Sequence, residues 1–164
     1  MPQDMYLKID GITGESTDAG HKDEIEILSY SHGVSQTTSA TRSTAGGATV
    51  ERANHQDFTI TKYLDAATPN LNKWCCEGKH ITTIGLTLYR ASASQQRVAY
   101  MKYDLSDSIV SSVSVGGGGG DLPVETVTFN YSKIVWTYVP QDEKKGTAGG
   151  NLPTGWDLKE NKAS

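Results

Sequence analysis

The sequence has few cysteines, no long hydrophobic run and no excess of positive charge. Its only cysteines, Cys75 and Cys76, are adjacent, and neighbouring cysteines rarely bridge each other because the intervening peptide would be strained. They cannot build a disulfide framework or a four-ligand zinc site, so we expect two small buried side chains in a reducing compartment. No segment approaches the ~18 apolar residues of a membrane span, which predicts no membrane insertion.

The net charge also limits the classes of partner that the sequence predicts. The 164 residues include 15 Lys and Arg against 19 Asp and Glu, a net charge of −4. Nucleic acids and anionic membranes select basic surfaces, so neither is an expected partner. The segment 1–5 has neither the basic nor the apolar region of a signal peptide, which predicts a cytoplasmic origin. The length predicts a single domain over residues 1–164.

Alternation of apolar and polar residues is the dominant pattern, and it predicts about eight strands. Asp104 and Asp107 are expected in a turn between two of these strands, and 161–164 is expected to be a tail. The expected strands cover 5–9, 24–33, 57–64, 81–90, 97–105, 109–115, 124–139 and 155–158.

One short helix interrupts the strands. Thr68 is typical of an N-cap and Pro69 of the first helical position. Leu71 and Trp74 lie on one apolar stripe, and Gly78 is typical of a helix end. Together these features predict a mainly β fold, an antiparallel β-barrel or sandwich with one short α-helix packed on its side.

Two segments depart from this plain pattern. Residues 35–54 are mostly Ser, Thr, Ala and Gly, too polar to bury themselves and longer than ordinary loops, so an extended functional loop is expected. In 124–139, Val127 and Phe129 share one face. Beyond Lys133 both faces become apolar, which predicts a strand covered on both sides or bent around a barrel corner.

No catalytic, cofactor or metal constellation stands out. His21 lies near Glu24, but at the start of a strand, where a solvated turn is expected. His55 and Asp57 share a face without a third ligand, which favours a surface pair over a metal site. The glycine run 116–120 lacks the Lys-Ser/Thr of a phosphate loop. We therefore predict no enzyme, and the polar loops indicate surfaces that meet other chains.

A series of segments spans almost the whole chain in a familiar order. It comprises DMYLKI at 4–9, GES at 14–16, HKDEIEILSY at 21–30, FTITKYLD at 58–65, TPNL at 68–71, GKH at 78–80, VSSVS at 110–114 and GWD at 155–157. In this order the segments resemble the Hcp family, the haemolysin-coregulated proteins of type VI secretion.

The resemblance implies a β-barrel flanked by a helix that assembles with itself into hexameric rings. The rings stack into a tube, which carries a spike at its tip and is driven into a neighbouring cell by a contractile sheath. The lumen can hold small effectors, and the subunit is exported without a signal peptide. Two alternatives from other classes remain open: a monomeric β-sandwich binding module, for instance for carbohydrate, and a small hydrolase using His21 or His55.

The resemblance also assigns roles to residues. Segment 35–54 resembles the family's ring-stacking loop, although it has a charge and fewer glycines than is usual; its central residues are Thr41, Arg42, Ser43, Thr44, Ala45, Gly46 and Gly47. Ser31 matches a lumen-facing position, and His32 stands where relatives often carry an aromatic residue. From the apolar pattern, Ile134, Trp136 and Tyr138 are the expected subunit interface or covered wall.

Overall fold

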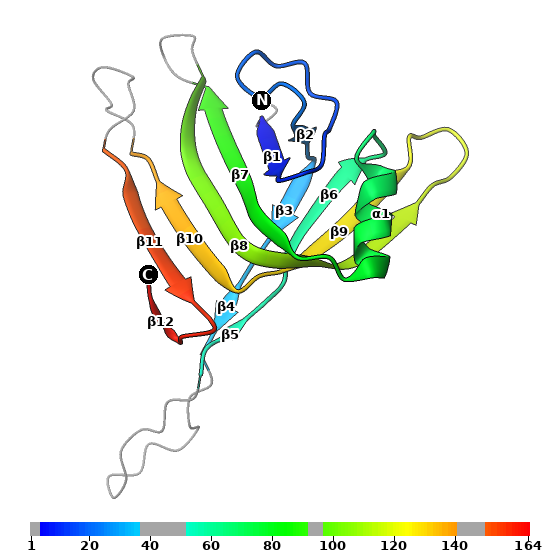
Figure 1. The fold of residues 1–164 in the computed structure, drawn as a ribbon. Helices are drawn as coiled ribbons and strands as arrows, with labels where there is room; N and C mark the ends of the chain where they lie inside the picture. The colour runs from blue at the N-terminus through cyan, green and yellow to red at the C-terminus, as the bar shows by residue number, and fades with distance from the viewer. Residues whose placement is uncertain (1–3, 37–51, 92–96, 141–149) are drawn as a thin grey trace, which may run out of the picture.

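The computed structural model describes residues 4–36, 52–91, 97–140 and 150–164 (Figure 1). Within these ranges the chain forms twelve strands and a single helix. The strands are β1 (Met5–Ile9), β2 (Ile25–Glu26), β3 (Ser29–Ser31), β4 (Val34–Ser35), β5 (Asn54–His55), β6 (Phe58–Tyr63), β7 (Ile81–Ala91), β8 (Arg97–Gly116), β9 (Val124–Asn130), β10 (Lys133–Tyr138), β11 (Leu152–Asp157) and β12 (Lys162–Ala163), and the helix is α1 (Thr68–Glu77).

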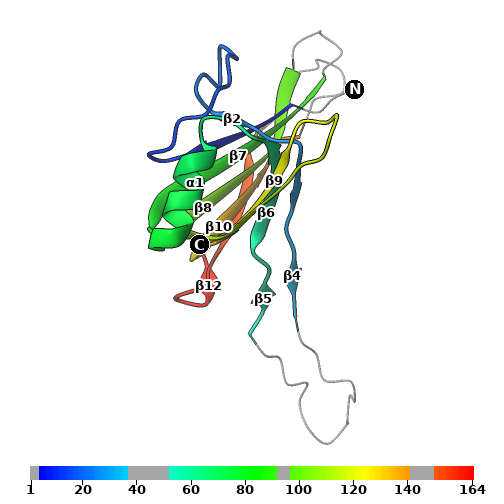
Figure 2. The same cartoon turned by 90° about the vertical axis from the view of Figure 1, so that its right-hand side faces the viewer.

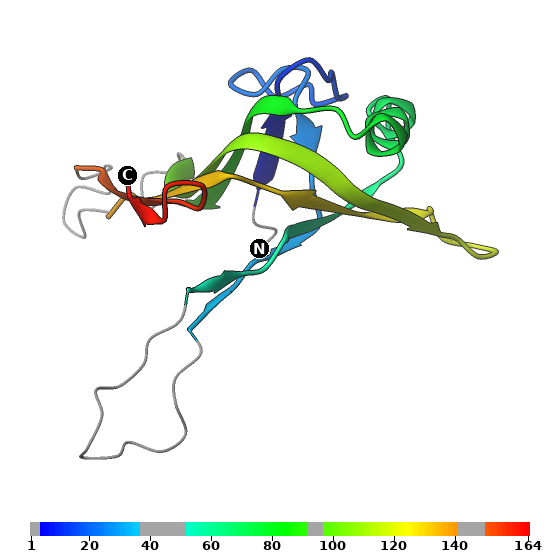
Figure 3. The same ribbon diagram turned by 60° about the horizontal axis from the view of Figure 1, so that its bottom comes forward.

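Two antiparallel sheets share the long strand β8. The first sheet has the order β12-β11-β10-β8-β7-β1-β2, and the second has the order β3-β6-β9-β8. The first part of β8 pairs with β7 and β10 and its second part with β9, so β8 crosses from one sheet to the other (Figure 3). Among the described strands no pairing closes the sheets into a barrel, and the fold is an open, sandwich-like version of the predicted mainly β architecture.

The hydrophobic core lies between the two sheets. The second sheet contributes Phe58, Ile60, Val127 and Phe129 on its inner face, each no more than 1% exposed. The predicted alternation in these strands is thereby confirmed, because side chains at every second position of a strand share a face. Residues of the first sheet cover them from the other side: Leu7, Ile84, Leu86, Leu88, Leu105 and Ile134.

Helix α1 closes one end of this core. Leu71 and Trp74 are buried, as the apolar stripe predicts, and Gly78 ends the helix in a left-handed conformation with φ 62°. The prediction that Thr68 is the N-cap is wrong by one position, because the N-cap is Ala67. The Thr68 hydroxyl instead accepts the Asp65 amide and donates to a carboxylate of β9. The helix is too short to cross a membrane.

A buried charge cluster joins α1 to the second sheet. The Lys62 side chain is fully buried, and its ammonium group donates to Asp65 (2.8 Å), Thr68 (3.2 Å) and Glu125 (3.3 Å). The carboxylate of Glu125 is itself fully buried. Two such charges remain inside a core only when each compensates the other, so the cluster fixes the position of α1.

Several predicted strand boundaries are wrong where the chain passes from one sheet to the other. The expected strand 124–139 is divided at Tyr131 into β9 and β10, which belong to different sheets. The expected strand 24–33 is divided into β2 and β3, which also belong to different sheets. Conversely, 97–105 and 109–115 form the single strand β8, so Asp104 and Asp107 lie in a strand rather than in a turn. Hydrophobic alternation continues through a change of sheet and therefore does not reveal it.

The chain end is also more ordered than predicted. Residues 162–163 form β12, which pairs with Trp156 and Asp157 of β11, where a tail was expected. Asp107, at a positive φ of 48°, contacts both Lys159 and the His80 imidazole. These contacts hold the turn before β12 against the point where β8 leaves the first sheet.

Candidate functional surfaces

The outer face of the second sheet carries two complete rows of hydroxyl groups. Cross-strand partners in one row are Ser31, Thr59, Thr128 and Ser112, and in the other Ser29, Thr61, Thr126 and Ser114. Directly opposed residues point to the same side of a sheet. We call these eight residues the hydroxyl face. They are exposed or half-buried, whereas the residues between them belong to the core.

The hydroxyl face is polar but carries no charged residue. Neighbouring hydroxyls bond to one another, as Ser112 and Thr128 do at 2.6 Å. The acidic Asp57 at one end is already engaged, because it accepts hydrogen bonds from Ser111 (2.7 Å) and Asn130 (3.0 Å). Such a surface offers hydrogen bonds to water or to a passing polar chain, but no strong charge or apolar patch to retain one.

The structure places Ser31 on this face and His32 on the opposite side. Ser31 is exposed on the edge strand β3. The His32 ring packs inside, with its centroid 5.5 Å from that of Phe58 and 5.7 Å from that of Tyr131. Ser31 and His32 therefore point to opposite sides of the second sheet, and His32 is not part of the hydroxyl face.

The predicted stacking-loop residues 41–47 lie outside the described residues. The described ends of segment 35–54 do form an antiparallel pair, β4 with β5, which we call the stem (Figure 2). The stem leaves the sandwich next to the hydroxyl face, because β4 follows β3 and β5 precedes β6. At its base the Gln56 amide donates to the Gly33 carbonyl at 2.9 Å.

Two histidines meet at the base of the stem. The Nδ1 atoms of His32 and His55 each lie 3.4 Å from the Tyr131 hydroxyl, which donates to the Gln56 carbonyl at 3.2 Å. Burial lowers the pKa of both His32 and His55, and it raises the pKa of Tyr131. Among the described residues, the buried Nε2 of His32 has no hydrogen-bond partner.

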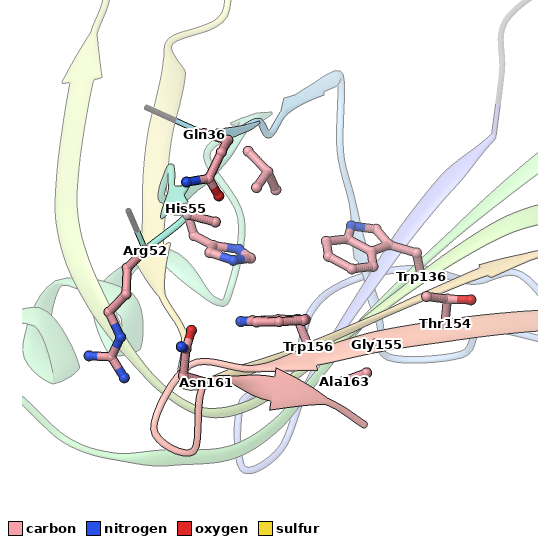
Figure 4. A pocket seen from close by; sticks show the side chains of 11 residues that line it. Gln36, Arg52, His55, Trp136, Thr154, Gly155, Trp156, Asn161 and Ala163 are labelled. Carbon is pink, nitrogen blue, oxygen red and sulfur yellow. The ribbon is translucent and has the colours of Figure 1, made fainter. Parts of the chain in front are cut away.

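An aromatic pocket of about 680 Å³ lies between the stem and the C-terminal strands. The side chains of Trp136, Trp156 and His55 face it (Figure 4). Val34 and Arg52 line it from the stem side, and Asn161 lines it from the turn before β12. The pocket is therefore apolar with a single charged group, Arg52, among its lining residues.

The three predicted wall residues occupy different environments. Ile134 is fully buried in the core, Trp136 is half-buried at the pocket, and Tyr138 is 44% exposed. Tyr138 stands directly opposite Leu152 of β11, which is 60% exposed. We call the paired strands β10 and β11 the wing (Figure 1). Its outer end carries the exposed apolar side chains of Tyr138 and Leu152.

The other predicted sites do not converge. The turn expected at His21 is present, but the His21 side chain is not solvated. Its ring stacks on Tyr6 at 4.4 Å, and its two nitrogens contact Glu24 and the Tyr89 hydroxyl. His55 and Asp57 point to different partners and do not form the expected surface pair. Within the described ranges no three His, Cys, Asp or Glu side chains gather around a metal position.

The prediction of two buried cysteines holds in part for Cys75 and is wrong for Cys76. Both are free thiols, but only Cys75 packs against the core, at an intermediate exposure, while Cys76 is exposed. Cys75 lies four positions after Leu71 and therefore shares its buried stripe, whereas Cys76 points away from the core.

The hydroxyl face itself was missed from the sequence. Its signal is visible in the segments FTITKY, ETVTF and SSVS, in which Ser or Thr occurs at every second position. That spacing identifies a polar strand face. It does not reveal that the strands are neighbours, or that their registers align the hydroxyls in rows.

Comparisons with known proteins agree with this architecture. A family model described as "Type VI secretion system effector, Hcp" matches residues 6–138. Protein hcp1 of Pseudomonas aeruginosa is 40% identical over 162 residues, 98% of each chain. The Major exported protein of the same organism is 27% identical over 145 residues, 84% of this chain and 80% of that protein.

Solved structures show the same fold over the whole chain. A type six secretion system protein superimposes with a TM-score of 0.89 and 34% identity, covering 98% of this chain and 99% of that chain. Hcp1 from Salmonella typhimurium superimposes with a TM-score of 0.80 and 35% identity over the full length of both chains. The fold is thus that of a secreted component of type VI secretion. The chain belongs to the Hcp family of type VI secretion system effectors.

Proposed function

We propose that this chain is the tube subunit of a type VI secretion system, in which hexameric rings stack and the hydroxyl face lines the lumen. The observation that carries the proposal is the pair of uncharged hydroxyl rows that includes Ser31. A channel wall must remain hydrated and bind its cargo weakly. Hydroxyl groups satisfy both needs, because they hold water without the strong attraction of charges or apolar patches.

The position of α1 supports the same orientation. Thr68 of α1 bonds to Glu125, and Lys62 bonds to Thr68, and both Lys62 and Glu125 lie on the inner side of the second sheet. The helix therefore lies on the side opposite the hydroxyl face. With the hydroxyl face toward the lumen, α1 faces the outside of the ring.

The wing supports a role in contacts between subunits. Its outer end carries Tyr138 and Leu152 on paired strands, next to the half-buried Trp136. Contiguous exposed apolar groups of this kind mark interaction sites. In the proposed ring each wing contacts the neighbouring subunit, as a heterologous contact must do to close a ring. Ile134 lies on the same face of β10 as Trp136 and Tyr138, at the end that is buried in the core.

The remaining roles follow from the family. Segment 35–54, led out by the stem, is proposed to reach the next ring. The tube is proposed to assemble in the cytoplasm inside a contractile sheath, to carry a spike at its tip and small effectors in its lumen, and to leave without a signal peptide. It is proposed to act as a structural protein and carrier without catalysis of its own. Membership of a family of type VI secretion effectors supports this assignment.

The test is the mass of the purified chain by light scattering, with electron-microscopic images of the same fraction. We expect rings, and a reconstruction with the second sheet inside and α1 outside. Rings with the opposite orientation contradict the lumen assignment but not the tube assignment. A monomer at all concentrations favours the binding-module alternative, for which the Trp136 and Trp156 pocket provides an aromatic platform.

A matched pair of variants tests the subunit contact. Tyr138→Asp places a charge on the wing, and Tyr63→Asp places one at a similarly exposed tyrosine (44% and 47%) on the second sheet. We expect Tyr138→Asp to reduce the ring fraction and Tyr63→Asp to preserve it. Equal ring fractions in the two variants argue against the wing as the interface.

A further inference from the structure

The stem has few contacts of its own with the body of the protein. It consists of two residue pairs, Val34 with His55 and Ser35 with Asn54. Of these residues only His55 is not exposed. The attachment of the stem therefore depends on the side chains at its base, His55 and the preceding His32.

His32, just before β4, and His55 in β5 attach the two strands of the stem to the body of the protein. His32 packs among Phe58 of β6, Tyr103 of β8 and Trp136 of β10. His55 lies nearly parallel to Trp136, with 6.5 Å between ring centroids, and meets Tyr131 edge-on. We propose that His32 and His55 form a proton-sensitive clasp, which holds the stem against Tyr131 and Trp136 while both rings are neutral and releases it when they are protonated.

Among the residues that the structure describes, no carboxylate contacts either ring. The titratable groups facing the pair are Tyr103 from β8 and Tyr131 from the β9–β10 junction, and the charged group lining the same pocket is Arg52. The nearby Asp57 is bound by Ser111 and Asn130. Among the described residues, a charge on either ring meets mainly aromatic faces, together with the Gln56 backbone in the case of His32, and it repels the other ring and Arg52.

The direction of the effect follows from the shifted pKa values. Burial lowers the pKa of both histidines in the closed clasp, and the neighbouring His55 lowers that of His32 further. The open state then binds more protons than the closed state, so closure is less favourable at low pH. The clasp is fully closed above the ordinary histidine pKa of about 6.5 and loses stability as the pH falls below it.

The clasp does not depend on the proposed tube, but it has a consequence for it. Because the stem leads into the segment proposed to reach the next ring, acidification would weaken stacking more than ring formation. This step rests on the proposed function, whereas the opening of the stem can be measured on the single chain.

Amide hydrogen exchange of the full chain tests the clasp. The exchange is compared at about pH 7.5 and about pH 5.5, on either side of the ordinary histidine pKa, after correction for intrinsic rates. We expect a severalfold loss of protection at the lower pH for the amides of Ser35, Asn54 and Gln56, which point into the stem ladder, and no loss in β6. Unchanged protection of the stem overturns the proposal.

Variants separate protonation from packing. The double variant His32→Phe/His55→Phe keeps two aromatic rings but removes the proton acceptors, so the pH dependence of stem protection should disappear. The control His80→Phe alters a 76% exposed histidine bound to Asp107 and should leave that dependence intact. Persistence of the pH dependence in the double variant overturns the proposal.

A second measurement needs no substitution. Nuclear magnetic resonance titration of the imidazole protons gives the pKa of each histidine in the unaltered protein. We expect His32 and His55 to titrate below the ordinary value, with the stem amide signals shifting in the same pH range. Titration of both at or above the ordinary value overturns the clasp even where the double variant does not fold.

Discussion

The core beneath α1 and the outer end of the wing differ in how completely the described residues cover apolar side chains. Around α1, Leu71 is fully buried and the charges of Lys62 and Glu125 are enclosed. On the wing, Tyr138 and Leu152 remain 44% and 60% exposed beside the aromatic pocket. The described residues enclose the core beneath α1, whereas the outer end of the wing has apolar side chains available to a second molecule.

The difference shows where folding ends and association begins. Burial of apolar area is worth roughly 25 cal/mol per Å², so an uncovered wing forgoes stability that the folded chain could have gained. The region around α1 should therefore govern the stability of the single chain. The wing should govern assembly, and substitutions in the two regions should affect different measurements.

The largest effect is expected inside the charge cluster. Lys62→Met removes the cation and leaves Glu125 and Asp65 without their shared partner, which should cost about 3–5 kcal/mol in the free energy of unfolding. Urea unfolding of the dilute chain measures it. The compensated variant Lys62→Met/Glu125→Leu should regain most of the loss, and a loss equal to that of the single variant would contradict the pairing.

A slightly smaller loss of unfolding free energy is expected from a substitution in the buried apolar stripe of α1. Leu71→Ala creates a cavity at a fully buried position beneath α1, and such truncations cost about 2–5 kcal/mol. Thermal unfolding with circular dichroism detects the loss, and Asn72→Ala on the exposed side of α1 is the matched control. A change of similar size in the control would mean that helix propensity rather than packing is measured.

The wing should behave in the opposite way. Tyr138→Ala should change the unfolding free energy of the dilute chain by no more than about 0.5 kcal/mol, as exposed substitutions usually do. Its effect should appear instead as a lower ring fraction in light scattering. If Tyr138→Ala destabilises the single chain as strongly as Leu71→Ala, the proposed difference between the two regions is contradicted.

The smallest effect is expected at a surface hub that belongs to neither region. Arg97 bonds to Asp18, Asp4 (2.9 Å) and the Tyr6 hydroxyl (2.8 Å). The hydrogen bond from Arg97 lowers the pKa of Asp18 below its usual 3.8. Its contribution is therefore present above that value and is lost as the pH falls through the lowered pKa.

The variant Asp18→Asn tests this contribution. The melting temperature of the parent chain should fall slightly more between about pH 7 and about pH 3 than that of the variant, because only the parent has this carboxylate to protonate. Asp10→Asn, at an exposed acidic residue of the same N-terminal region, is the control. An identical pH dependence in the parent and in Asp18→Asn would contradict a stabilising contribution from the bond between Arg97 and Asp18.

Local properties of the chain were determined by the sequence alone. Alternation identified the buried faces at Ile60, Val127 and Phe129, because the period of two belongs to each strand separately. Gly78 ended the helix where predicted, because a residue without a side chain accepts the left-handed conformation. The order of motifs along the chain also sufficed to indicate the family.

Only the tertiary structure decided which residues meet. Lys62 and Glu125 are 63 positions apart, and no periodicity pairs them. The change of sheet at Tyr131 and the bend in β8 follow from how two sheets pack, which alternation does not record. The hydroxyl rows and the contact of His32 and His55 with Tyr131 likewise depend on register and packing between distant segments, since these are set by the whole core rather than by any local pattern.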